Sequence, residues 1–406
     1  MATIAVLGTF DTKGEEHLFV AELLREQKHD PLLIDVGAQG DPPEKIDVHR
    51  REIAEAGGSS VREIQEKNDR GFAVETMSKG APEIVSKLVS TGKIHGVISL
   101  GGSGGTAICT TAMRALPIGF PKVMVSTMAA GNIAHYVGDK DIVMIPSIVD
   151  VAGINRISRK ILTQAAGAIA GMVSMPATTT EDKPLIAASM FGNTTDCVNR
   201  AQKILEDAGY EVLVFHATGA GGKTMESLIE SGMIAGVLDV TTTEWADEFV
   251  GGVLNAGPTR LEAAARNGVP AIVAPGCLDM VNFGPPETVP REFEHRNFYQ
   301  HNPQVTLMRT NAEECAEIAK IIAEKLNLST APVSFLIPNR AISVISAADQ
   351  KFHDPIADKV LFQAVRAYLR EDIPVHELDQ QINDQSFAEA CAKELIANIE
   401  KANSNG

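Results

Sequence analysis

The chain has 406 residues, with 36 Lys and Arg against 52 Asp and Glu, so its formal net charge is −16. This length exceeds what a single hydrophobic core normally supports, and we expect two domains of ordinary globular composition. The acidic balance argues against nucleic acid and anionic membranes as general partners, because both repel negative charge.

Short apolar runs alternate with amphipathic stretches through the first part of the chain. In order, we expect a strand at 3–7, a helix at 14–27, a strand at 31–36, a helix at 82–90, a strand at 96–100, a helix ending at 114, strands at 122–126 and 142–145, and a helix at 161–172. Continuous apolar strands indicate a parallel sheet that is covered on both faces.

A polar segment flanked by prolines, 176–184, predicts the connection between two domains, 1–180 and 181–406. Beyond it we expect strands at 185–190, 211–215, 237–240, 271–273, 305–307 and 333–337 and near 375, and helices at 196–208, 260–266, 312–326, 355–369 and 387–399. Both halves open with a strand, a polar turn, a helix, a strand and a glycine, which predicts two divergent copies of one βαβ plan. The expected fold is α/β, with two Rossmann-like doubly wound parallel-sheet lobes and a ligand cleft between them.

The five cysteines stand singly, with no CxxC pair, and we expect reduced thiols in a cytoplasmic protein. The apolar N-terminus lacks a basic segment, and Asp11 and Lys13 follow too early for a signal peptide. No apolar run approaches the length of about 20 residues that spans a bilayer. We therefore expect no membrane association.

A glycine-rich run follows the strand at 96–100 and opens a helix. It consists of Gly101, Gly102, Ser103, Gly104, Gly105 and Thr106. Its backbone N–H groups can surround an anion at the positive end of the helix, whereas the simpler alternative is a tight turn. The run also fits G-x-G-x-x-A, but the next strand ends in Ser126 and Thr127 rather than in the acid that NAD requires. We predict a phosphate site here, with Thr127 beside it, and disfavour NAD.

A second glycine-rich turn lies between the strand at 211–215 and the helix expected after it. Its candidate binding residues are Gly219, Gly221, Gly222, Lys223 and Thr224. The turn resembles a P-loop, but Ala217 stands where the first glycine belongs, so a true Walker loop is not expected. A phosphate or carboxylate cradle with Lys223 as counter-charge and a plain glycine turn both remain open.

Thr9, Asp11 and Lys13 follow the first strand, where ligands of doubly wound sheets bind. Asp11 could accept a hydrogen bond from a ribose or bind Mg²⁺, and Lys13 could pair with a phosphate. We include all three residues in the predicted nucleotide site.

Loops of the second half supply the candidate substrate contacts Thr242, Glu244, Asp279 and Asn282. The spacing of Thr241 and Glu244 is also typical of a helix capping box. Asp11 and Asp279 are the candidate catalytic carboxylates.

Cys277 also follows a strand, but no histidine is placed near it, and we expect a small buried thiol rather than a nucleophile. His295 and His301 stand six residues apart, which is no ligand spacing, so no metal site is predicted.

Taken together, these loops resemble a known family. The matching segments are GTFDTKGEE at 8–16, LGGSGGT at 100–106, LPIG at 116–119, PKVMVST at 121–127, HATG at 216–219, GG at 221–222 and GCLD at 276–279. The best-known member of the family is the N-terminal domain of the tomato mosaic virus resistance protein, described as ATP-binding. The resemblance covers nearly the whole chain and implies a two-lobed Rossmann-like structure, ATP binding and homodimers, but no settled reaction.

The sequence therefore predicts an ATP- or nucleotide-binding protein whose glycine-rich loops hold the phosphates, with Mg²⁺ as a candidate companion ion. Two alternatives remain open: an ATP-dependent or hydrolytic enzyme acting on a small acidic metabolite, and a non-catalytic two-lobed metabolite sensor. The expected partners are a phosphorylated small molecule and a second copy of the chain, with neither nucleic acid nor membrane among them.

Overall fold

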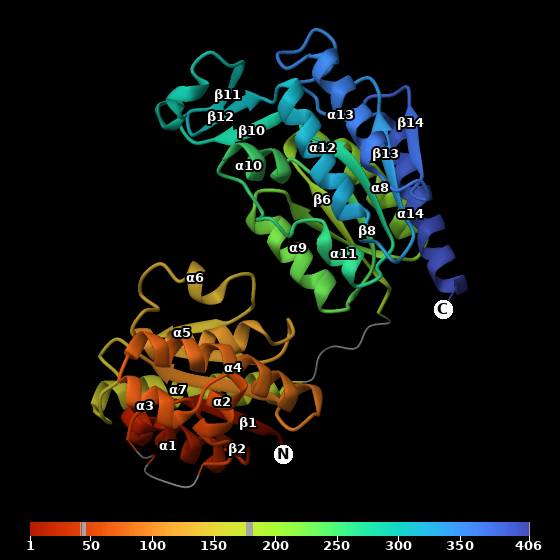
Figure 1. Ribbon diagram of the computed structural model, residues 1–406. Helices are drawn as coiled ribbons and strands as arrows, with labels where there is room; N and C mark the ends of the chain where they lie inside the picture. The colour runs from red at the N-terminus through yellow and green to blue at the C-terminus, as the bar shows by residue number, and fades with distance from the viewer. Residues whose placement is uncertain (41, 43–45, 176–181, 406) are drawn as a thin grey trace. The chain divides into compact units, whose positions relative to one another are not determined.

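The computed structural model describes residues 1–40, 42, 46–175 and 182–405 (Figure 1). The chain divides into two compact units, Met1–Thr179 and Thr180–Gly406. The connection predicted at 176–184 lies outside the described residues as far as residue 181. None of the helices described combines the length and the hydropathy that crossing a bilayer requires.

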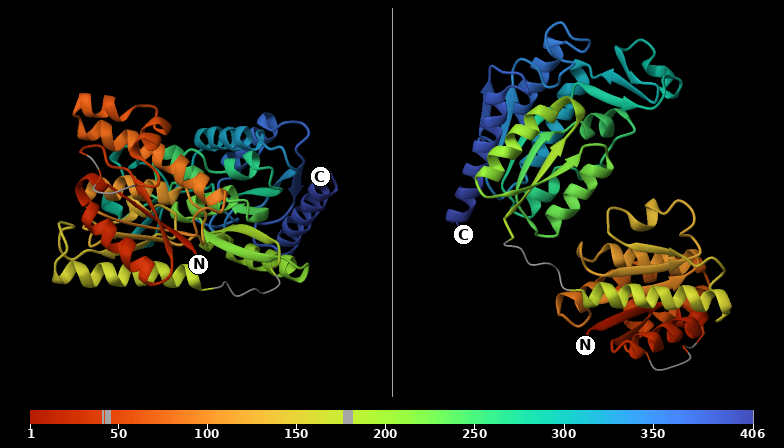
Figure 2. Two further views of the ribbon diagram at one scale, coloured as in Figure 1. Left: turned by 90° about the horizontal axis from the view of Figure 1, so that it is seen from below. Right: turned by 180° about the vertical axis from the view of Figure 1, so that it is seen from behind.

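The first unit is a five-stranded sheet between two layers of helices (Figure 2). Its elements are β1 (Thr3–Gly8), α1 (Phe10–Glu26), β2 (Asp30–Asp35), α2 (Arg50–Ala56), α3 (Val61–Lys67), α4 (Arg70–Ser90), β3 (Gly96–Gly101), α5 (Ser103–Arg114), β4 (Lys122–Ser126), α6 (Ala134–Val137), β5 (Val143–Pro146) and α7 (Arg156–Ser174). All neighbouring strands are parallel, in the order β2-β1-β3-β4-β5. Helices α1 and α7 pack on one face of the sheet, and α2, α4 and α5 pack on the other.

Two inner strands of this sheet, β3 and β4, are buried along their whole length. All six residues of β3 and all five of β4 are buried, because helices cover both of their faces. This explains why the two strands read as uninterrupted apolar runs rather than as alternating patterns.

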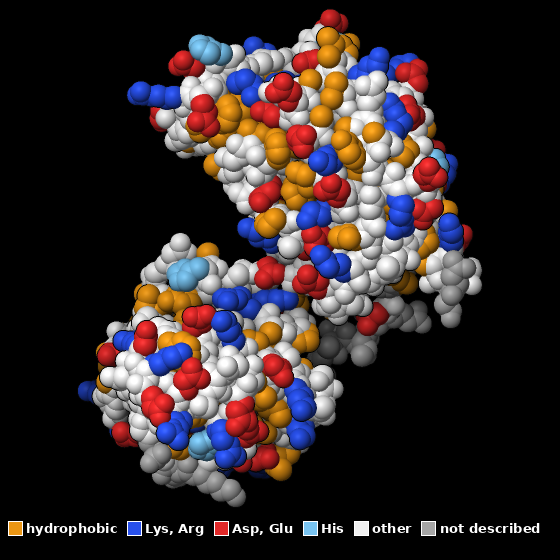
Figure 3. Space-filling model, in the orientation of Figure 1, with side chains coloured by type: hydrophobic (Ala, Val, Ile, Leu, Met, Phe, Trp, Pro, Cys, Tyr) orange, Lys and Arg blue, Asp and Glu red, His pale blue; other side chains and the backbone are white. Residues whose placement is uncertain are grey.

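The second unit contains a larger parallel sheet and a small antiparallel one. Its elements are β6 (Leu185–Met190), α8 (Thr195–Asp207), β7 (Glu211–His216), α9 (Ala220–Glu230), β8 (Ile234–Thr241), α10 (Glu244–Val250), α11 (Glu262–Arg266), β9 (Ala271–Gly276), β10 (Met280–Phe283), β11 (Phe298–Asn302), β12 (Val305–Arg309), α12 (Ala312–Leu326), β13 (Val333–Pro338), α13 (Pro355–Tyr368), β14 (Val375–Leu378) and α14 (Gln385–Asn405). The six parallel strands run in the order β14-β13-β9-β8-β6-β7, and the antiparallel strands in the order β10-β12-β11. Acidic and basic side chains are interspersed over the face of this unit that Figure 3 shows.

The predicted α/β class, with two parallel-sheet lobes, is confirmed. When only the strands of each parallel sheet are numbered in chain order, both sheets contain the order 2-1-3-4-5, and the second sheet adds a sixth strand. This shared order agrees with the expected duplication of one plan.

One strand was assigned to the wrong kind of sheet. The run at 305–307 forms β12, which pairs antiparallel with both β10 and β11 instead of joining the parallel sheet. A short apolar run has the same pattern in either sheet, so only its partners reveal where it belongs.

Candidate functional site

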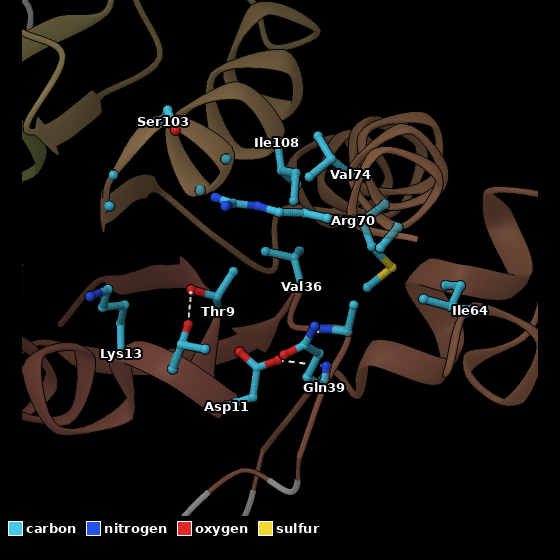
Figure 4. Close-up of a pocket in the computed structure, with 18 of the residues that line it drawn as sticks. Thr9, Asp11, Lys13, Val36, Gln39, Ile64, Arg70, Val74, Ser103 and Ile108 are labelled. Atoms are coloured by element: carbon cyan, nitrogen blue, oxygen red, sulfur yellow. Dashed lines mark hydrogen bonds between the residues drawn. The ribbon is translucent and has the colours of Figure 1, made fainter. Parts of the chain in front are cut away.

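A pocket of about 900 Å³ opens in the first unit, among the loops that follow β1, β2, β3 and β4 (Figure 4). Strand β1 lies between β2 and β3, so the strand order reverses at this point of the sheet. Ligands of open α/β sheets bind at such reversal points, outside the carboxyl ends of the strands.

Most of the residues predicted for nucleotide binding in the first half of the chain line this one pocket. They are Thr9, Asp11, Lys13, Gly101, Gly102, Ser103, Gly104, Gly105 and Thr127. The exception is Thr106, which is buried, donates a hydrogen bond to the Gly102 carbonyl at 2.7 Å and contacts the Ser126 hydroxyl at 2.6 Å. Thr106 therefore fastens the glycine-rich turn to the end of β4.

The amino terminus of α5 faces the pocket without a side-chain cap. Its N-cap residue is Gly102, which has no side chain to accept a hydrogen bond from the first turn. The first N–H groups of a helix have no partner inside the helix, and here they come from Ser103, Gly104 and Gly105. Together with the helix dipole, these N–H groups favour a negatively charged group in front of the helix.

Three glycines of this turn are not required by the fold itself. A Cβ atom built on Gly102, Gly104 or Gly105 would meet no atom closer than 3.5 Å, and none of the three has a positive φ. Gly101 differs, because its Cβ would lie 3.2 Å from the Cα of Gly105. Glycine inside a helix costs about 0.5–1 kcal/mol relative to alanine, so Gly104 and Gly105, which lie in the first turn of α5, lower stability without a visible benefit to packing.

Among the residues that the structure describes, two basic side chains line the pocket. Arg70, the first residue of α4, extends across the pocket toward the glycine-rich turn (Figure 4), and its Nη2 atom lies 3.5 Å from the position of a Cβ on Gly104. Lys13 donates a hydrogen bond from Nζ to the carbonyl of Val151. The sequence did not reveal Arg70, because it stands outside every recognisable motif.

Asp11 lies at the edge of the pocket with its carboxyl group held by backbone amides. Its Oδ2 atom accepts hydrogen bonds from the N–H groups of Ala38 at 2.9 Å and Gln39 at 2.7 Å, and Arg50 Nη1 lies 4.0 Å from the same oxygen. The Oδ1 atom is buried and has no hydrogen-bond partner among the described residues. Two backbone amides already bind this carboxylate, and Arg50, which pairs with Asp35 at 2.6 Å, lies nearby, so Asp11 is poorly placed to hold a divalent cation by itself. The described part of the chain contains no group of three or more potential metal-ligating side chains.

Part of the pocket wall is apolar. Val36, Ile64, Val74, Met77 and Ile108 form this wall, and all but Val74 are buried (Figure 4). The pocket thus combines an anion-binding turn with a surface suited to a flat apolar group.

In the second glycine-rich turn, the backbone amides already bind a carboxylate of the protein, that of Glu244. The Glu244 Oε1 atom accepts hydrogen bonds from Gly219 N–H at 2.7 Å and Gly222 N–H at 3.1 Å. Its Oε2 atom pairs with Arg260 Nε at 2.8 Å. The turn is therefore a carboxylate cradle, and the carboxylate belongs to a buried side chain. The predicted capping box of Thr241 and Glu244 is wrong, because α10 begins at Glu244 and has no side-chain cap.

The fold itself requires the glycines of this second turn. A Cβ on Gly219, Gly221 or Gly222 would come within 3.0 Å of another atom, and Gly219 also has a φ of +81°. Lys223 is exposed, and the Thr224 hydroxyl donates to the Ala220 carbonyl at 2.9 Å. The turn follows β7, the counterpart of β2, so it is not equivalent to the turn that follows β3.

The predicted substrate contacts in the second unit are buried, and each has partners inside the protein. The Thr242 hydroxyl donates to the Ala274 carbonyl at 3.0 Å, and the Asn282 amide donates to Asp247 at 2.8 Å. Asp279 accepts from the Ser343 hydroxyl at 2.7 Å, and burial raises the pKa of its carboxyl group. These residues, like Glu244, are therefore engaged within the second unit itself.

Cys277 is the buried thiol that the sequence indicated, and burial raises its pKa well above the usual value. A thiol that stays protonated is a poor nucleophile.

Comparison with known proteins decides the family. Residues 2–178 match the N-terminal domain, and residues 183–399 the C-terminal domain, of the family described as Uncharacterised protein family (UPF0261). The chain belongs to this family. A UPF0261 protein of Clostridium tetani is 53% identical over 98% of this chain and 99% of its own length.

The relationship to the tomato protein is confirmed at the level of the family. The ToMV resistance protein Tm-1(GCR237) of Solanum lycopersicum is 44% identical over 80% of this chain, which covers 44% of that longer protein. Among solved structures, MurG of Acinetobacter baumannii aligns over the full length of both chains, with 11% identity and a TM-score of only 0.25.

Proposed function

We propose that the first unit of this UPF0261 protein binds a nucleotide, with ATP as the first candidate, in the pocket at the carboxyl ends of β1, β3 and β4. The observation that carries the proposal is the set of glycines at 102, 104 and 105. Gly104 and Gly105 cost helix stability, and at none of the three positions do the backbone angles or the neighbouring atoms require a glycine. Their use is to let a ligand approach the open amides of α5.

The second unit supports this assignment by contrast. There, the amides of Gly219 and Gly222 hold the carboxylate of Glu244. At α5 no side chain of the described residues plays that part. An external anion, such as a phosphate, would complete the first turn as Glu244 completes the second.

The size and lining of the pocket suit a nucleotide. Its volume of about 900 Å³ lies within the range of about 300–1,000 Å³ that is usual for small-molecule sites. The apolar wall around Ile64 and Met77 would accept a base, while Ser103 and Thr127 offer hydroxyl groups near the phosphates. Mg²⁺ would bind mainly through phosphate oxygens and water, as it does with other nucleotides.

Binding is better supported than catalysis, because both candidate carboxylates are already engaged. Asp11 is held by two amides, and Asp279 is buried against Ser343. An ATP-dependent enzyme and a metabolite sensor remain the alternatives, and ADP release measured with a panel of small acidic metabolites distinguishes them.

Isothermal titration of the full-length chain with ATP, with and without Mg²⁺, tests the proposal. We expect binding by the wild type and its loss in Gly104→Asp, where the new carboxylate would lie beside Arg70 as an internal anion. Gly167→Asp is the matched control, because Gly167 is exposed in α7 and a Cβ there meets nothing within 4 Å. Absence of heat with millimolar ATP would contradict the proposal.

The family resemblance also leads us to propose a homodimer. Sedimentation equilibrium tests this, and the mass of a single chain at all concentrations would rule it out.

A further inference from the structure

Arg70 lies in the proposed nucleotide site, and none of the contacts proposed above involves it. It begins α4, lines the pocket and reaches across it toward Gly104 (Figure 4). Among the described residues, its guanidinium group forms no hydrogen bond or ion pair. Arg70 is exposed, so a ligand in the pocket can reach its guanidinium group.

The acidic residues near Arg70 in the sequence are all engaged elsewhere. Asp69 caps its own helix, accepting hydrogen bonds from the N–H groups of Gly71 at 2.7 Å and Phe72 at 3.2 Å. The nearby glutamates of α3 and α4 form ion pairs with other basic residues: Arg62–Glu66 at 2.7 Å, Lys67–Glu63 at 2.8 Å and Lys79–Glu75 at 2.6 Å. Local pairing therefore leaves Arg70 available to a negatively charged ligand.

We infer that Arg70, which lies beside the amino terminus of α5, binds the phosphate chain of the ligand together with the helix amides, so that the site selects polyphosphates over ligands with a single small anion. This inference rests on the proposed function of the same pocket. The amides of α5 and the guanidinium of Arg70 approach the space in front of Gly104 from two different elements. A planar guanidinium can donate two hydrogen bonds to one phosphate group while the helix amides hold another.

If Arg70 binds phosphate groups, its removal should lower the affinity for ligands in proportion to the phosphate groups that they carry. Titration of the full-length chain with inorganic triphosphate, ATP, AMP and adenosine separates the phosphate contacts from the contacts to the base. In Arg70→Ala we expect the affinity for ATP and for inorganic triphosphate to fall at least about tenfold, because hydrogen bonds to charged groups contribute this much. AMP should lose less than ATP, and adenosine should bind as it does to the wild type.

Two further variants serve as controls. Arg70→Lys keeps the charge but not the planar fork, and should recover only part of the affinity. Arg62→Ala removes an exposed arginine that is paired with Glu66 outside the pocket, and should bind every ligand as the wild type does.

The outcomes separate this inference from the function on which it rests. If the wild type binds ATP and Arg70→Ala binds ATP and triphosphate equally well, the role of Arg70 is wrong and the nucleotide site stands. An equal loss for adenosine would also overturn the inference, because Arg70 would then shape the pocket rather than bind phosphate. If the wild type binds neither ATP nor triphosphate, the proposed function fails and the inference fails with it.

Discussion

The Glu244 carboxylate lies 2.7 Å from the amide nitrogen of Gly219, in the place where a glycine-rich turn would hold a bound anion. Because of this contact, the amides of the turn in the second unit have an acceptor within the protein and need no bound anion. The first unit has no equivalent side chain in front of α5. Clustered backbone amides thus bind a side chain and support the fold in the second unit, whereas in the first unit the amides at the start of α5 have no side-chain acceptor.

Replacing Glu244 with alanine should destabilise the second unit. The substitution leaves two buried amides, on Gly219 and Gly222, without an acceptor, and each such group costs about 1–3 kcal/mol. Arg260 loses its contact with Glu244 but keeps its pairing with Asp239. Urea unfolding measures the change.

Added acetate provides a second readout for this variant. Acetate carries the carboxylate that Glu244→Ala removes, so it should raise the melting temperature of the variant and leave the wild type unchanged. A variant as stable as the wild type would show that the contact contributes nothing.

Gly104→Ala should stabilise the protein and weaken ligand binding at the same time. Alanine removes the cost of a glycine in a helix, worth up to about 1 kcal/mol, and its methyl group enters the space proposed for the phosphates. Gly167→Ala, in the exposed part of α7, should stabilise to a similar degree without affecting ATP. Thermal unfolding and calorimetric titration of both variants make the comparison, and wild-type affinity in Gly104→Ala would contradict the assigned role.

Asp247 should make stability depend on pH near neutrality. Burial raises the pKa of its carboxyl group to about 7, although the hydrogen bonds from Asn282 oppose the shift. The folded state therefore holds a proton that the unfolded chain releases near its ordinary pKa of 3.8. Between these two pH values, the free energy of unfolding falls as pH rises, by at most about 1.4 kcal/mol per pH unit.

The Asp247→Asn variant isolates this contribution. Because the asparagine does not titrate, the difference in stability between variant and wild type should change between pH 4 and 7 and become constant above 7. Urea unfolding at several pH values measures it, and parallel curves would mean that Asp247 is ionised in the folded protein.

The five cysteines should be unreactive in the folded protein. All five are buried, and burial raises the pKa of the Cys109 thiol to about 12. A thiol reagent such as DTNB should therefore label none of them quickly in buffer and all five in denaturant. Rapid labelling of Cys277 in buffer would reopen its role as a nucleophile.

The sequence by itself determined the class of the fold and the place of the glycine-rich turn that lines the pocket. Apolar strands that alternate with amphipathic helices are local patterns, and they can be recognised in the sequence without knowing where the elements lie in space. The strand β3, the glycines at 101–105 and the helix α5 are consecutive in the chain, so their backbone chemistry could be predicted without any tertiary contact. The neighbouring residues Asp11 and Lys13 could be predicted because ligands gather at the ends of parallel strands.

The tertiary structure alone decided which groups meet at the two glycine-rich turns. Arg70 comes from a helix more than thirty residues before Gly104, and Glu244 reaches the turn at 219–222 from the end of β8. The sequence around Arg70 or Glu244 does not indicate which turn each residue reaches, because helix packing and strand order determine these contacts. The two turns therefore look alike as sequences, and they differ because a side chain fills one of them and a pocket lies in front of the other.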